Sequence, residues 1–195
     1  MRINPQFGKP ETYIGPGGYC ASDEDIIITT LLGSCVSIAL YDARRAVGGL
    51  NHFMLPSPKG SQSSEYPDSA KYGVNAMELL INEMLKKGAR RERLTAKVFG
   101  GASVLAIGTG SRNNVPQDNI DFAEEFLKAE GVPVLSRDVG GTTARKILFF
   151  VRDGRVLLKR ITGTLIAAVK LKERTYLERI VRKEGTAGDV TLFDP

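Results

Sequence analysis

The sequence is poor in the residues on which disulfide frameworks and structural metal sites depend. It contains two cysteines (Cys20 and Cys35), one histidine (His52) and no tryptophan. Two cysteines cannot build a disulfide framework. These three side chains also do not complete a tetrahedral zinc site unless carboxylates or a second chain help. We therefore expect free thiols and no metal ion.

Long hydrophobic runs are missing as well. The apolar run at residues 165–169 has five residues, whereas a membrane span needs roughly 18–20. The N-terminus, Met1-Arg2-Ile3-Asn4-Pro5, has no apolar core of the kind found in secretory signals. The 195 residues, 42% hydrophobic and 25% charged, are typical of a soluble globular protein with one main domain. We expect a cytoplasmic protein without membrane insertion.

The excess of positive charge is local. The net charge is +5, but residues 1–150 hold 17 Lys and Arg against 16 Asp and Glu, while residues 151–195 hold 10 against 6. No helix-turn-helix, zinc-finger or aromatic RNA-binding pattern accompanies these charges. A solvated basic helix explains them without nucleic acid, and an acidic protein partner fits them equally well.

The order of apolar patterns predicts an α+β fold. Strands outnumber helices and do not alternate regularly with them, which favours a layered α/β sandwich with a mixed, mostly antiparallel sheet and two main amphipathic helices. We expect a flexible segment at 1–12, a domain at 13–163, an exposed loop at 56–69 and a basic extension at 164–195. The predicted strands are residues 26–30, 36–41, 49–55, 94–99, 132–135 and a hairpin over 146–161, and the predicted helices are 74–85, 116–131 and 164–183.

The candidates for chemistry lie between residues 29 and 52. Cys35 follows Gly33-Ser34 at a break between two strands, where unpaired backbone N–H groups at Ser34 and Cys35 could receive an oxyanion. His52 lies on the strand that should return beside Cys35. An imidazole near a thiol can take its proton and then stabilise the thiolate.

The spacing alone leaves catalytic and structural roles about equally supported. A single cysteine is most often a small buried hydrophobic residue, and a single histidine is often structural. Three hydroxyls, those of Thr29, Thr30 and Ser34, could orient the imidazole. Cys20 has no base near it in the sequence and is interpreted as a bystander. The glycine-rich segments at 100–103 and 108–111 lack the phosphate-loop and dinucleotide patterns, so they are interpreted as turns, and Arg112-Asn113 as structural.

Longer motifs around these residues resemble the chemoreceptor glutamine deamidase family, CheD. The resemblance covers residues 13–161, with two departures: Thr109-Gly110 appear as added residues, and the extension after 161 has no counterpart. The motifs are Gly17-Gly18-Tyr19, Leu32-Gly33-Ser34-Cys35-Val36, Gly49-Leu50-Asn51-His52-Phe53-Met54-Leu55-Pro56, Tyr72-Gly73-Val74-Asn75-Ala76-Met77, Lys97-Val98-Phe99-Gly100-Gly101-Ala102, Gly110-Ser111-Arg112-Asn113 and Asp138-Val139-Gly140-Gly141-Thr142-Thr143-Ala144-Arg145.

The resemblance implies a cysteine hydrolase with the sandwich fold of cytotoxic necrotising factor deamidases. It implies a triad of Cys35, His52 and Thr29, a thioester intermediate and no cofactor. The implied substrates are glutamines on the cytoplasmic helices of methyl-accepting chemotaxis receptors, and a CheC-type phosphatase is an implied second partner. The alternatives are another thiol hydrolase on the same pair (transglutaminase-like or peptide-cleaving), a non-catalytic adaptor and, last, nucleic-acid binding.

Overall fold

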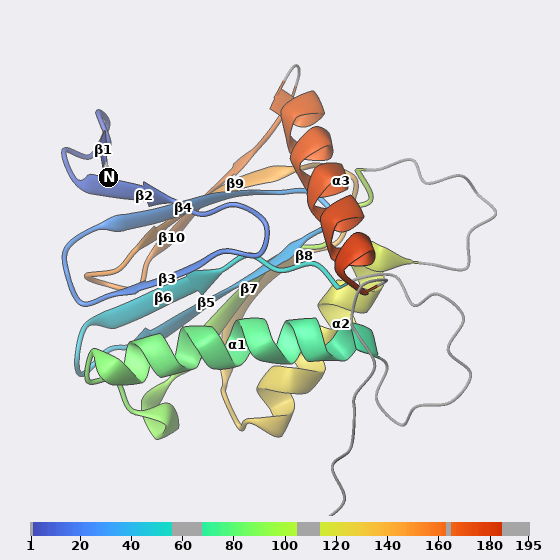
Figure 1. Cartoon of the computed structure of the whole chain (residues 1–195). Coiled ribbons are helices and arrows are strands. Elements are labelled where there is room, and N and C mark those ends of the chain that lie inside the picture. Colours follow the sequence, from blue (N-terminus) through green and yellow to red (C-terminus); the bar gives the residue numbers. More distant parts are fainter. Residues whose placement is uncertain (1, 56–67, 105–113, 163–164, 185–195) are drawn as a thin grey trace, which may run out of the picture.

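The chain folds as two five-stranded sheets packed face to face, with helices on the outside (Figure 1). The structure is a computed structural model and describes residues 2–55, 68–104, 114–162 and 165–184. The first sheet has the order β1-β2-β4-β9-β10 and the second the order β3-β6-β5-β7-β8. Both are mixed, because β2 and β4 are parallel, as are β7 and β8, and all other neighbours are antiparallel. The predicted α+β class is confirmed.

The strands and helices follow the apolar patterns of the sequence. In the first sheet the strands are β1 (Arg2–Ile3), β2 (Pro10–Tyr13), β4 (Ile27–Leu32), β9 (Arg145–Phe150) and β10 (Val156–Arg160). In the second they are β3 (Tyr19–Ser22), β6 (Val47–Asn51), β5 (Val36–Asp42), β7 (Thr95–Gly100) and β8 (Val134–Val139). The helices are α1 (Asp68–Lys86), α2 (Val115–Ala129) and α3 (Leu165–Glu184), with a 3-10 turn at Arg91–Arg93.

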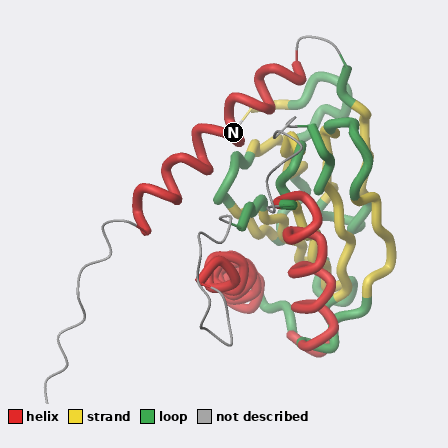
Figure 2. The backbone as a smooth tube through the Cα atoms, turned by 90° about the vertical axis from the view of Figure 1, so that its right-hand side faces the viewer, coloured by secondary structure: helices red, strands yellow, loops and turns green. Residues whose placement is uncertain are grey.

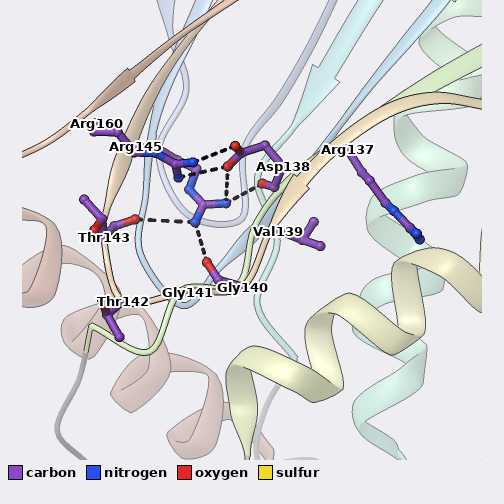
Figure 3. Close-up of a pocket in the computed structure, with 9 residues that line it drawn as sticks. All are labelled: Arg137, Asp138, Val139, Gly140, Gly141, Thr142, Thr143, Arg145 and Arg160. Carbon is purple, nitrogen blue, oxygen red and sulfur yellow. Dashed lines mark hydrogen bonds and ion pairs between the residues drawn. The ribbon is translucent and has the colours of Figure 1, made fainter.

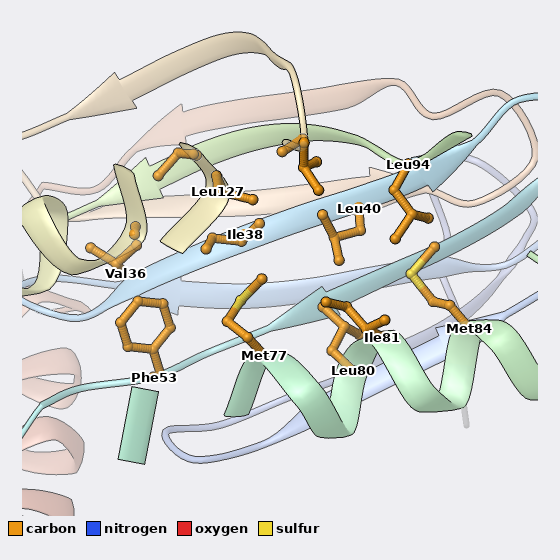
Figure 4. Close-up of a cluster of buried hydrophobic side chains, with 14 of the residues drawn as sticks. Val36, Ile38, Leu40, Phe53, Met77, Leu80, Ile81, Met84, Leu94 and Leu127 are labelled. Carbon is orange, nitrogen blue, oxygen red and sulfur yellow. The ribbon is translucent and has the colours of Figure 1, made fainter. Parts of the chain in front are cut away.

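One hydrophobic core lies between the second sheet and helices α1 and α2. Met77, Leu80, Ile81 and Met84 recur at the spacing of one helix face and are completely buried against β5 residues such as Ile38 (Figure 4). A second core fills the space between the sheets, where Ile28 and Phe149 of the first sheet meet Ala39 and Leu50 of the second.

Two expectations about the termini can be compared with this fold. The segment expected to be flexible, residues 1–12, contains β1 and most of β2, because β2 pairs with β4 and buries Glu11 against Asn4. Residues 165–184 of the basic extension form α3, which lies apart from the α1–α2 layer (Figure 2). Most of the exposed loop expected at 56–69 lies outside the described residues. Among the helices described, none is both long and apolar enough to cross a membrane.

Candidate active site

Cys35 immediately precedes β5 and His52 immediately follows β6, and their side chains meet at this end of the strand pair. Val36 and Phe53 exchange backbone hydrogen bonds of 3.0 and 2.9 Å. This bridge continues the antiparallel register of β5 and β6. In that register His52 lies opposite Ser37, so the side chains of Cys35 and His52 are diagonal neighbours on the same face of the strand pair. Cys35 Sγ lies within 4.8 Å of a ring nitrogen of His52, and both side chains are buried. The sequence prediction that the returning strand brings them together agrees with this geometry.

Thr30, and not Thr29, contacts the imidazole. Thr30 Oγ1 lies 2.7 Å from His52 Nδ1, whereas the Thr29 hydroxyl donates to the Ile147 carbonyl on β9 at 2.7 Å. The reason is the alternation of side chains along β4. Even-numbered residues of this strand, such as Ile28, face the second sheet and His52, and Thr29 faces away. The expected contact between Thr29 and the imidazole is therefore not made.

The hydrogen bonds of Thr30 define which ring nitrogen is available as a base. Its hydroxyl also donates to the Ile14 carbonyl at 2.8 Å. Because a hydroxyl has only one proton, we assign the proton between Thr30 and His52 to Nδ1, which donates to Thr30 Oγ1. Nε2 then carries a lone pair, and among the described residues this buried atom has no hydrogen-bond partner. His52 is thus arranged to accept a proton at Nε2.

Three consecutive backbone N–H groups converge beside Cys35 and bind a carboxylate. The carboxylate belongs to Glu173 of α3: its Oε1 accepts from the N–H groups of Gly33 (2.8 Å) and Cys35 (3.2 Å), and its Oε2 accepts from the N–H (2.9 Å) and hydroxyl (2.7 Å) of Ser34. The predicted donors at Ser34 and Cys35 are therefore present, and Gly33 adds a third. A Cβ at residue 33 would stand 2.8 Å from Glu173 Oε2, so only glycine lets the carboxylate come this close.

Glu173 was not identified from the sequence, although a signal exists. Along α3 the residues that face the sheets are apolar except at this position, which interrupts the stripe in its middle. The stripe consists of Ile166, Val169, Tyr176, Leu177 and Ile180. A charged side chain on the buried stripe of an amphipathic helix requires a partner, and here the partners are the N–H groups of residues 33–35.

Burial keeps the thiol and the imidazole uncharged, and the Glu173 carboxylate adds to this effect at the thiol only. The pKa of Cys35 is raised well above its ordinary value, first because the thiol is buried and then because Glu173 is negative and accepts its hydrogen bond. Burial lowers the pKa of His52 from 6.5 to about 4, although Glu173 acts in the opposite direction. In this structure the pair is therefore a neutral thiol and a neutral imidazole, not a thiolate and an imidazolium.

Asn119 and Arg145 hold the loop that carries Cys35, and sequence reasoning gave neither a role. The buried amide of Asn119 donates to the Ser34 carbonyl and accepts from the Leu55 N–H. The buried guanidinium of Arg145 pairs with Asp138 and donates to the Gly140 carbonyl (Figure 3). It also donates to the Gly100 carbonyl. The turn after Asp138 is therefore closed around this arginine.

The loop that carries Cys35 is bonded directly to the segment that Arg145 holds. Gly101 N–H donates to the Cys35 carbonyl at 2.7 Å. Gly100 has a φ of +115°, and a Cβ there would lie 2.1 Å from the Cys35 carbonyl oxygen, so glycine is required for this contact. Of the other segments considered from sequence, 108–111 and Arg112-Asn113 lie outside the described residues. Cys20 is half-buried on β3, opposite Leu50.

The cluster has donor atoms that a metal ion could use, but its surroundings favour an anion. Ligand atoms of Cys35, His52 and Glu173 lie within 4.8 Å of one another. However, three backbone N–H groups direct their positive ends into the same space, which stabilises negative charge and opposes a cation. The arrangement is suited to nucleophilic attack on a carbonyl group, with Cys35 as nucleophile, His52 as base and the N–H groups as oxyanion donors.

Comparisons with known proteins find relatives of this chain. The family model described as "CheD chemotactic sensory transduction" matches residues 54–160. A "Probable chemoreceptor glutamine deamidase CheD" of Laribacter hongkongensis is 43% identical over 96% of this chain and 89% of its own length. A protein of the same name from Bordetella petrii is 50% identical over 73% of this chain and 62% of its own.

The similarity to solved structures is weaker. A Neisseria meningitidis protein of family DUF152 aligns with 81% of this chain and 77% of its own, at 16% identity and a TM-score of 0.45. The Laribacter hongkongensis relative, in contrast, spans nearly the whole chain, and the family model matches more than half of it. The chain belongs to the CheD family.

Proposed function

We propose that this protein deamidates glutamine side chains of chemotaxis receptors, converting them to glutamate and releasing ammonia. One observation carries the proposal: a buried thiol, an imidazole with a free lone pair and three backbone N–H donors converge on a single carboxylate group. A carboxylate is the product of side-chain amide hydrolysis. The printed names of the relatives support chemoreceptors as substrates.

The proposed reaction has two halves, formation of a thioester on Cys35 and its hydrolysis, and the same groups act in both. His52 Nε2 takes the proton of Cys35, and the thiolate attacks the side-chain amide carbon of glutamine. The N–H groups of residues 33–35 stabilise the oxyanion. The imidazolium protonates the departing ammonia, which leaves a thioester on Cys35. His52 then removes a proton from water, which releases glutamate and the free thiol. Thr30 keeps Nδ1 protonated and the ring in place.

The proposed partners, receptor helices and a phosphatase, follow from the family resemblance. The resemblance implies glutamines on cytoplasmic receptor helices as substrates, so we propose that the reaction takes place in the cytoplasm. A CheC-type phosphatase is proposed as a second partner on the resemblance alone. No cofactor is needed for amide hydrolysis by a thiol and an imidazole.

The first prediction tests the nucleophile. Receptor cytoplasmic fragments are incubated with the protein and mapped by mass spectrometry, where each converted glutamine adds about 1 Da through hydrolysis of one amide. We expect Cys35→Ala to lose at least 10³-fold in rate, in the range of removing a covalent nucleophile. Cys20→Ala is the matched control and keeps the wild-type rate.

The same experiment separates the alternatives. A peptide-cleaving thiol hydrolase would shorten the fragment, and a transglutaminase would add an amine of greater mass. An adaptor would bind receptors or a phosphatase in a pull-down whether or not Cys35 is present, and no mass change would accompany binding. Wild-type conversion rates in the Cys35→Ala variant would refute the proposed mechanism.

A further inference from the structure

Helix α3 closes the proposed active site. The thiol of Cys35 is completely buried, and α3 supplies the carboxylate that occupies the N–H groups beside it. α3 runs separately from the α1–α2 layer (Figures 1 and 2). No substrate side chain can reach Cys35 while Glu173 holds this position.

The contacts of Glu173 are those expected of the reaction product. An amide or acid group in this site would place one oxygen on the N–H donors and its carbon beside the sulfur. Glu173 Oε1 accepts two of these N–H groups, and one of its oxygens lies within 4.8 Å of both Cys35 Sγ and the ring of His52. A glutamate side chain is also what deamidation of glutamine leaves behind.

Apolar residues on either side of Glu173 pack the rest of α3 against the body of the protein. Val169 packs with Ala102 and Val104 in a small buried cluster, and Tyr176 and Leu177 pack against the core between the sheets. Lys172 lies over the ring of Tyr13 at 4.7 Å. The outer face of the helix is exposed and carries polar side chains such as Arg174 and Glu178, together with the exposed Leu171. The groove under α3 therefore accepts an amphipathic helix with one carboxylate or amide side chain in the middle of its apolar face.

Building on the proposed function, we propose that α3 occupies the groove in which the substrate helix binds, with Glu173 in the position of the reacting side chain. The helix then acts as a built-in product-like inhibitor that the receptor helix must displace. The partner that fits the groove is an amphipathic helix whose glutamine has apolar neighbours four residues before it and three, four and seven residues after it, as Glu173 has in Val169, Tyr176, Leu177 and Ile180.

The second prediction is that the enzyme deamidates itself when Glu173 is replaced by glutamine. In Glu173→Gln, the Cys35 thiolate attacks the amide carbon of residue 173, the carbon–nitrogen bond breaks, and ammonia leaves with a proton from His52. Water then cleaves the thioester and restores a glutamate and a free thiol. Peptide mapping of the purified variant should show residue 173 as glutamate, about 1 Da heavier than the encoded residue because an amide has been hydrolysed.

Two matched variants control this result. Glu178→Gln places a glutamine on the same helix, where the side chain is 56% exposed, and this residue should remain glutamine. The double variant Glu173→Gln with Cys35→Ala should keep glutamine at 173, which excludes spontaneous deamidation. Conversion in that double variant, or equal conversion at 178, would contradict the proposal.

The third prediction concerns release of the site. Glu173→Ala should increase the rate of receptor-fragment deamidation about tenfold or more, because at least one hydrogen bond to a charged group no longer holds α3 in place. An unchanged or lower rate would contradict inhibition by α3. Folding of each variant is checked by circular dichroism.

The outcomes separate this inference from the proposed function. If Glu173→Ala converts receptor glutamines but residue 173 of Glu173→Gln stays glutamine, the proposed function stands. The inference that α3 occupies the site of the substrate helix is then wrong. If residue 173 is converted but no receptor glutamine is, the catalytic site is correct and receptors are not its substrate.

Discussion

At the scale of single residues, the chemistry depends on which side of β4 a hydroxyl lies. Thr29 and Thr30 are adjacent in the sequence and both are buried, yet only Thr30 reaches His52. The contact has a chemical consequence, because it assigns the Nδ1 proton and leaves Nε2 free for the thiol. In the proposed mechanism Thr30 acts through His52 and is a positioning residue.

The fourth prediction compares the two threonines. Thr30→Val keeps the shape of the side chain but removes the hydroxyl, and we expect kcat to fall about 10- to 100-fold, a part of the 10²- to 10⁴-fold that a positioned base contributes. Thr30→Ser should restore most of the rate. Thr29→Val should instead cost about 1 kcal/mol of stability, the net value of one hydrogen bond, with kcat unchanged.

Steady-state kinetics on a receptor fragment and urea unfolding distinguish these effects. The Glu173→Ala background is suitable, because α3 then does not limit access to Cys35. A loss of kcat in Thr29→Val, with none in Thr30→Val, would show that the hydrogen bonds of the structure do not describe the working enzyme.

At the scale of elements, the loop carrying Cys35 is held by neighbouring segments as well as by its own strands. Gly101 N–H binds the Cys35 carbonyl, and Arg145 at the start of β9 binds the carbonyl of Gly100 and pairs with Asp138 on β8. Arg145 thus joins three strands behind the site. Burial lowers its pKa, whereas Asp138 acts in the opposite direction, so the ion pair keeps a nearly inaccessible guanidinium charged.

The fifth prediction tests this junction. Arg145→Ala leaves the carbonyls of Gly100 and Gly140 without this donor, while Asp138 keeps its pairing with Arg160. We expect the free energy of unfolding to fall by about 2–4 kcal/mol, because each buried carbonyl left unsatisfied costs about 1–3 kcal/mol. Arg137→Ala is the matched control: its side chain is 67% exposed and pairs with Glu124, so the loss should stay below about 1 kcal/mol. Urea denaturation measures both, and similar losses would argue against the junction.

At the scale of the whole molecule, the buried imidazole couples folding to pH. Burial lowers the pKa of His52 from 6.5 to about 4, so between these values the unfolded chain binds a proton that the native protein does not. The stability that the neutral imidazole contributes is fully present above the pKa of the unfolded chain, 6.5, and it is lost as the pH falls from there toward about 4.

This linkage predicts a pH dependence of stability. Because of His52, the free energy of unfolding should be lower at pH 5 than at pH 7 by about 2 kcal/mol. Urea unfolding at the two pH values measures the difference, and His52→Gln provides the reference for all other titrating groups. An equal pH dependence in wild type and His52→Gln would mean that the imidazole is not buried in its neutral form.

The elements of the fold could be predicted because their signals are local. The apolar spacing of Met77, Ile81 and Met84 indicates a helix wherever the chain places it, and Asp153-Gly154 marks the hairpin of β9 and β10. The strands of the N-terminal segment were missed, since a two-residue strand such as β1 has almost no pattern of its own and depends on its pairing with β2.

For the site, the sequence by itself determined that Cys35 and His52 would come close, because a short antiparallel return brings nearby positions together. It also placed hydroxyls and N–H donors next to the thiol. Only the tertiary structure decided which threonine faces the imidazole, since that depends on which face of β4 meets the second sheet. It alone also brought Glu173 to Cys35 from 138 residues away, because helix docking is set by the packing of surfaces that no local pattern describes.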